Sequence, residues 1–158
     1  MTARFGVINT ADQGDTYYAG MVKDAANWAI MELDKRTVSI QIYAGTTSCA
    51  TGDGQAYFRI PSALNGMNLV TVAAAVVTAG TTGTMDIQIA NVTDAVDMLT
   101  TKITIDTAET DSKTAATPAV IDTTKDDVVT GDMLRIDIDA IHSGTAAKGL
   151  VVELQFWT

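Results

Sequence analysis

The chain has 158 residues, of which 47% are hydrophobic and 18% are charged, and its formal net charge is −9. This length and apolar content suit one folded domain with a packed core. The negative charge argues against a nucleic-acid or anionic membrane surface, because contact with phosphate groups requires a basic patch. We therefore expect neither nucleic acid nor membrane among the partners.

The sequence contains 25 threonines and a single cysteine. Threonine is β-branched and fits the pleated surface of a sheet, so its abundance favours strands. One cysteine cannot form an internal disulfide, as expected of a chain made in a reducing cytoplasm. Residues 1–5 lack the charged start and apolar run of a secretion signal, and the longest apolar stretch, residues 69–77, is about half of what a membrane-spanning helix needs. These features predict a soluble protein without an export signal.

Residues 1–36 are predicted to form an N-terminal arm with a short helix. Residues 21–33 carry apolar side chains at helical spacing, and the alternative for this stretch is an extended arm. Aromatic residues are concentrated in this segment, at Phe5, Tyr17, Tyr18 and Trp28. Rings on such an arm are suited to anchoring in a partner's grooves, so we expect a contact with a partner there. The alternative is that the arm folds back over its own β-domain.

Strand patterns begin at Thr37, and the clearest is Leu134–Ile141. Its leucine and isoleucines alternate with one arginine and two aspartates, a two-residue period that only an extended chain sorts onto two faces. The predicted strands are Thr37–Ala44, Gly54–Ile60, Met67–Thr78, Thr84–Val92, Thr101–Asp106, Pro118–Asp122, Asp132–Ile141 and Gly149–Trp157. Eight short strands separated by turn residues, without long helical connections, predict an antiparallel all-β domain over residues 37–158, either a two-sheet sandwich or a barrel.

One strand, Leu69–Val77, is apolar on both faces. It could be a central strand covered on both sides, with its alanines allowing close approach. The preferred interpretation is a subunit contact, in which Val72, Ala74 and Val76 pack against another copy around a symmetry axis.

Catalytic chemistry is not predicted for this chain. The only histidine, His142, is followed by Ser143, whose side chain would point to the opposite face of an extended chain, and no nucleophile elbow is present. Cys49 has no charged neighbour that would lower the pKa of its thiol. One cysteine and one histidine cannot form an ordinary zinc site, so we expect no catalytic residue, cofactor or metal.

Calcium is the ion that best suits the acidic loops of the sequence. Asp126, Asp127 and Asp132 form one group, and Asp94 with Asp97 forms a second. Oxygen ligands from loops are what calcium prefers, but neither group has the spacing of an EF-hand. Solvated loop carboxylates are therefore the preferred interpretation.

Three segments carry a resemblance to a known class of proteins: Ala50–Val70, Thr81–Thr93 and Thr130–Asp139. They resemble small β-sandwich virion proteins of tailed bacteriophages, of the head-decoration or head- or tail-fibre type, and the similarity covers roughly residues 37–158. The resemblance implies a jelly-roll-like sandwich of about eight strands that associates as a trimer and has no enzymatic role.

The function expected from this resemblance is decoration and stabilisation of a phage capsid. The major capsid protein and further copies of the chain would be the partners, and the protein would be made in the host cytoplasm and located on the virion surface. The alternative is a tail- or head-fibre module that binds a glycan or a protein on the host surface.

Overall fold

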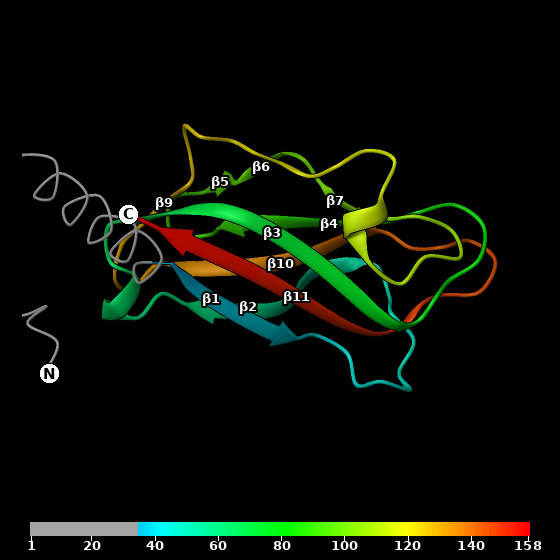
Figure 1. Ribbon diagram of the computed structural model, residues 1–158. Coiled ribbons are helices and arrows are strands. Elements are labelled where there is room, and N and C mark those ends of the chain that lie inside the picture. The colour runs from blue at the N-terminus through cyan, green and yellow to red at the C-terminus, as the bar shows by residue number, and fades with distance from the viewer. Residues whose placement is uncertain (1–34) are drawn as a thin grey trace, which may run out of the picture. The chain divides into compact units, whose positions relative to one another are not determined.

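Antiparallel β-strands make up most of residues 35–158, which are the residues that the computed structural model describes (Figure 1). They correspond to one of the two units into which the chain divides, Met1–Asp34 and Lys35–Thr158. The predicted arm and helix, with Phe5, Tyr17, Tyr18 and Trp28, lie outside the described residues. The elements of the described part are β1 (Arg36–Gln41), β2 (Gly52–Arg59), η2 (Ser62–Leu64), β3 (Met67–Thr78), β4 (Met85–Asn91), β5 (Val96–Asp97), β6 (Leu99–Thr101), β7 (Ile103–Ile105), η3 (Ser112–Thr114), β8 (Val120–Ile121), β9 (Asp127–Val128), β10 (Met133–Ala140) and β11 (Lys148–Trp157).

These strands form two larger sheets and one small pair. The first sheet has the order β1-β11-β3-β9, and the second has the order β2-β10-β4-β5, with β7 also pairing with β4. Strands β6 and β8 pair separately. Every pairing is antiparallel, so the predicted all-β class is confirmed.

Each of the eight predicted strands coincides with strand structure, and β3 begins and ends at the predicted residues. The predicted segment Thr101–Asp106 contains β7 together with the last residue of β6. Two strands of two residues each, β5 and β9, were not predicted. The described residues therefore contain eleven strands rather than about eight, because short pairings, one of them as local as Asn91 with Val96, add to the long strands.

A single cluster of buried side chains receives residues from both larger sheets. Leu69, Val152 and Phe156 come from the first sheet, whereas Ile87 and Ile136 come from the second, and all five are fully buried. The alternation read from the sequence places the leucine and isoleucines of β10 in this core and its arginine and aspartates on the other face.

The orientation of β3 contradicts the predicted subunit contact through Val72, Ala74 and Val76. Ala74 and Val76 are buried in the core and Val72 packs against it, so these side chains are not available to another copy. The pairing of β3 with β11 shifts register between Leu69 and Thr71, which identifies a β-bulge. A bulge adds one residue to a strand and changes which side chains face inward. The exposed side of β3 therefore carries other residues, of which Val77 is the most exposed at 67%.

Candidate functional site

His142 is buried at the end of the domain where three loops meet. Its Nε2 lies 3.3 Å from the carbonyl oxygen of Asp106. Its Nδ1 is buried and has no hydrogen-bond partner among the described residues. The ring lies directly over Gly80, where a Cβ atom would overlap its Cγ and Nδ1. Ser143 turns away and its hydroxyl donates to the carbonyl oxygen of Thr82, so no serine–histidine pair forms.

Cys49 is also enclosed by the fold. Only 3% of the residue is exposed, and its backbone N–H donates to the carbonyl oxygen of Ala147 at 2.8 Å. Burial raises the pKa of the thiol, which disfavours the thiolate required of a nucleophile or a metal ligand. The histidine and the cysteine are therefore both enclosed by the fold.

The acidic loop residues are arranged to hold turns together. The carboxylate of Asp132 is buried, and its Oδ2 accepts hydrogen bonds from the backbone N–H of Val129 at 2.8 Å and from the amide of Asn91 at 3.2 Å. The same Asn91 amide donates to Asp94 at 2.8 Å, so this buried asparagine links two loops. Asp127, by contrast, is exposed.

No metal-binding group is present within residues 35–158, where no three His, Cys, Asp or Glu side chains converge. The carboxylate of Asp132 accepts a hydrogen bond that closes a turn, and the carboxylate of Asp94 accepts one from Asn91. Each of the two acidic groups considered for calcium therefore contains one aspartate that makes structural hydrogen bonds. Asp132 departs from the prediction of solvated loop carboxylates because it is buried, whereas Asp94, Asp97 and Asp127 are exposed.

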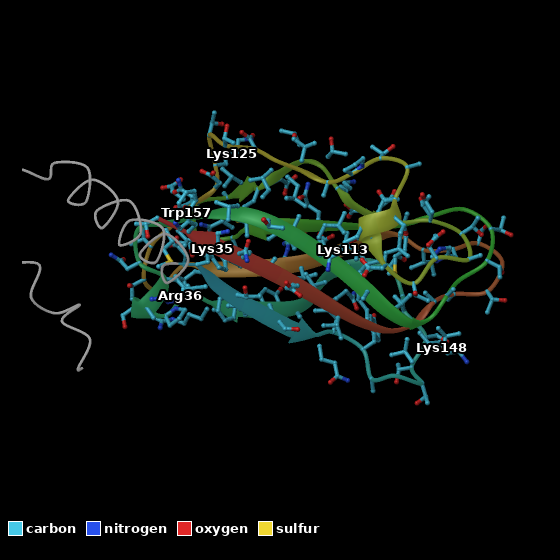
Figure 2. The ribbon with its side chains drawn as sticks, in the orientation of Figure 1. Lys35, Arg36, Lys113, Lys125, Lys148 and Trp157 are labelled. Carbon is cyan, nitrogen blue, oxygen red and sulfur yellow. The ribbon has the colours of Figure 1, made fainter. Side chains whose placement is uncertain are left out.

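Strand β1 lies at the edge of its sheet, and within residues 35–158 only β11 pairs with it. Thr37–Gln41 pairs with β11, and the N–H of Ile42 donates to the carbonyl oxygen of Leu150, so the even-numbered residues direct their backbone groups toward β11. The backbone groups of Thr37, Ser39 and Gln41 consequently point outward. Lys35 at the start of β1 and Trp157 of β11 lie at the same end of the sheet (Figure 2).

The charge of β1 is confined to Arg36 at its start. Natural edges are usually blocked by charges, proline or bulges, and the rest of the strand, Thr37–Gln41, contains neither charge nor proline. The edge strand of the other sheet, β2, differs because it carries Asp53 and Arg59 and has a register irregularity opposite β10. Figure 1 draws both edge strands along the same side of the domain.

Half-buried apolar residues accompany these two edges. We call the following set the apolar seam: Val38, Ile40, Ile42, Ala56 and Phe58, which pack against the core but are not fully covered. The hydroxyl of Tyr43, just after β1, hydrogen-bonds to Gln55 of β2 and so connects the two edges. An open strand edge beside partly covered apolar side chains is a surface suited to association with another chain.

The outer face of the second sheet carries an aromatic ring that is mostly open to solvent. Tyr57 of β2 is 59% exposed. Its ring lies against Gly54, whose added Cβ would come 3.0 Å from Cζ and 3.1 Å from Cε2 of the tyrosine. Gly54 has a φ of +68°, so a residue with a side chain would be strained there as well as obstructed.

An arginine beside this ring is held in place by two carboxylates. Arg135 lies opposite Tyr57 in the register, and its Nε and Nη2 donate to Asp137 at 3.0 and 2.8 Å. Asp137 is buried and also accepts from the N–H of Gly54 at 2.7 Å. Asp53 lies 3.7 Å from the same guanidinium. The hydrogen bonds to Asp137 raise the pKa of Arg135 above its ordinary value.

Next to Arg135 the sheet surface is hollowed into a groove of about 370 Å³. Ala90 and Val96 form part of its lining, and Asp97 contributes an exposed carboxylate. The register places Tyr57, Arg135, Ala90 and Asp97 in one row across β2, β10, β4 and β5. Sequence reasoning missed this row, and its one signal in the sequence is that Tyr57 follows the Gly52 and Gly54 turn closely.

No helix of the described residues has the length and apolar character needed to cross a bilayer. Comparisons of the whole chain with protein-family models, with curated proteins and with solved structures found no match.

Proposed function

We propose that this chain is a non-enzymatic structural protein of a tailed-bacteriophage particle, which decorates and stabilises the capsid exterior as a trimer. The resemblance of residues 50–70, 81–93 and 130–139 to phage virion proteins supports a location on a phage particle. The single core shared by both sheets supports the jelly-roll-like sandwich that this proposal includes.

The enclosure of the reactive side chains supports a role without catalysis. His142 is 2% exposed and Cys49 is 3% exposed, so neither can reach a substrate without local unfolding. The buried carboxylates of Asp132 and Asp137 are occupied by backbone N–H groups and by neighbouring side chains. A general acid or base needs a polar group that reaches the reacting atom.

The observation that carries the assembly proposal is the open edge of β1 beside the apolar seam. Three residues, Thr37, Ser39 and Gln41, direct backbone donors and acceptors away from the sheet. A closed three-fold ring requires a head-to-tail contact, so the β1 edge of one copy pairs with a different surface of the next. This contact satisfies the outward backbone groups and covers the seam, which contributes about 25 cal/mol per Å² of apolar area removed from water. In this proposal the trimer contact lies here and not at the inward-facing residues of β3.

A proline at position 39 tests this contact. Ser39→Pro removes an N–H that points away from β11 and places a ring on the free edge, so the pairing of β1 with β11 is retained while pairing with another copy is blocked. Ser39→Ala is the matched control because it keeps the N–H. Analytical ultracentrifugation should give three times the 16.6 kDa chain mass for the wild type and Ser39→Ala, and a lower mass for Ser39→Pro. An unchanged mass for Ser39→Pro would remove β1 from the contact.

Attachment to the particle is assigned to the N-terminal segment, which lies outside the described residues. Phe5, Tyr17, Tyr18 and Trp28 remain the proposed contacts with the major capsid protein. Alanine at all four positions should abolish co-sedimentation with capsids and leave the oligomeric mass unchanged. Full binding by that variant would overturn the assignment.

The alternative function is a receptor-binding fibre module. The exposed Tyr57 and the groove beside it support this alternative, because they offer a surface for a receptor. Copy number separates the two functions. Quantitative gel analysis or imaging of purified particles should find hundreds of copies over the head for a decoration protein. A handful at a tail or fibre tip would support the alternative instead.

A further inference from the structure

We propose that the outer face of the β2-β10-β4-β5 sheet binds a neutral saccharide along the row of Tyr57, Arg135, Ala90 and Asp97. Neighbouring strands are about 4.8 Å apart, so the four residues span about 14 Å across the sheet. The row lies on the outer face of its sheet, whereas the proposed assembly contact uses the β1 edge and Ala56 and Phe58, which flank Tyr57 in β2 but pack toward the core.

Tyr57 supplies an apolar surface at one end of the row. Strand residues that face water are normally polar, yet this ring is 59% exposed in the middle of β2. Its contact with Gly54 supports the ring from the main chain and limits its movement. A supported aromatic ring with a hydroxyl at its tip combines apolar contact area with hydrogen bonding at small entropic cost.

Arg135 supplies fixed donors in the middle of the row. Two of its nitrogens are held by Asp137, which is itself anchored by the N–H of Gly54, so the guanidinium orientation is set by a buried group. Its Nη1 makes no hydrogen bond within residues 35–158, and the side chain is 29% exposed. A donor already oriented before a ligand arrives loses little entropy on binding.

The groove supplies the remaining features of a small-ligand site. Its volume of about 370 Å³ lies within the range of small-molecule pockets, and its apolar lining includes Ala90, Val92 and Val96. Asp97 provides acceptors at the end opposite Tyr57. Asn91, Asp97 and Arg135 supply its polar groups, and polar groups beside apolar side chains orient a ligand in such sites.

The charges of the site select the class of ligand. Asp53, Asp97 and Asp137 outnumber Arg135 along the row, and Lys102, which interacts with Asp97, is already paired with Asp139 at 2.7 Å. The surrounding field therefore disfavours an anionic ligand. A cationic ligand would have to lie beside the guanidinium. A pyranose ring has an apolar face for Tyr57 and a rim of hydroxyls that both donate and accept, which matches Arg135 and Asp97.

The test is a binding measurement with the full chain. A glycan array containing neutral and anionic oligosaccharides is screened first, and the best neutral oligosaccharide is then titrated by NMR and calorimetry. We expect binding to neutral glycans, with the largest amide shifts at Tyr57, Arg135 and Ala90. Tyr57→Ala should weaken binding by about tenfold or more, the loss expected when a central contact residue is truncated, while Tyr57→Phe should retain most of it.

Two further variants complete the design. Asp97→Asn should weaken binding at the other end of the row, and Val77→Ala, an exposed position on the other sheet, should leave it unchanged. The proposal is overturned by preferential binding of anionic glycans, by no binding of neutral glycans at millimolar concentration, or by equal affinity of wild type and Tyr57→Ala. None of these results affects the oligomeric mass, so a failure here is distinguishable from a failure of the assembly proposal.

Discussion

Replacing Gly80 by alanine should destabilise the domain through a single contact. Gly80 is buried, and its φ lies outside the left-handed region, so alanine is compatible with the backbone there. The added methyl group would overlap Cγ and Nδ1 of His142 and come 2.7 Å from its Cβ. Overpacking of this kind costs about 1–3 kcal/mol, and the reduced entropy of the unfolded alanine chain offsets about 0.4–1 kcal/mol of it. We expect a net loss of about 1–2 kcal/mol in the free energy of unfolding.

A double-mutant cycle attributes this loss to the histidine. His142→Ala alone removes a buried ring and leaves a cavity, at an expected cost of about 2 kcal/mol or more. In the double variant the new methyl group occupies part of that space, so the cost of Gly80→Ala should disappear. The cycle should therefore give a coupling energy of about 1–2 kcal/mol.

Urea unfolding followed by far-ultraviolet circular dichroism measures all four proteins of the cycle. Gly66→Ala is the matched control, because Gly66 has a φ of +74° and nothing within 4 Å of an added Cβ. It should lose stability through backbone strain alone and be additive with His142→Ala. If Gly80→Ala is as stable as the wild type, or additive with His142→Ala, the proposed packing of the ring over Gly80 is wrong.

Three further predictions concern individual side chains. Cys49 should react with a thiol reagent only as fast as the domain opens, and a fast native reaction would contradict its burial; the reaction is read by mass spectrometry in increasing urea. Asp132→Ala should cost about 2–4 kcal/mol in urea unfolding, because two hydrogen bonds to a buried carboxylate are lost and the N–H of Val129 is left unpaired. The hydrogen bond from Lys102 to Asp139 raises the pKa of the lysine, so its stabilisation is complete below the unfolded pKa of about 10.4 and is lost as pH rises through the folded value. The pair is exposed and should contribute only about 0.2–1 kcal/mol, seen as a difference from Lys102→Met that vanishes at high pH; a difference that persists would exclude the ion pair as its cause.

The long strands were predictable where polar and apolar residues alternate strongly. Residues 134–139 of β10 alternate aliphatic and charged side chains, so both the strand and its buried face follow from the sequence. The three alanines at positions 73–75 of β3 give no such contrast. A bulge near Val70, which depends on pairing with β11, then changes the inward face, and this is why the subunit contact was assigned to the wrong side.

The shortest strands and the site depend on contacts that a single sequence does not reveal. Strand β9 has two residues, and it exists because Val128 pairs with Met67, far away in the chain. The row on the second sheet likewise requires that β10 lie between β2 and β4, which places Arg135 next to Tyr57. Neither strand order nor register is encoded in the periodicity of one segment.

The position of β11 has a consequence for how the protein is made on the ribosome. This strand, Lys148–Trp157, lies between β1 and β3, and its Gln155 contacts Thr37 across 118 residues of chain. Until β11 leaves the ribosomal exit tunnel, β1 and β3 lack the strand that both of them pair with. Contacts this distant make folding slow and leave unpaired strands open to aggregation. During translation, the nascent chain therefore has to wait for β11 before the first sheet can assemble.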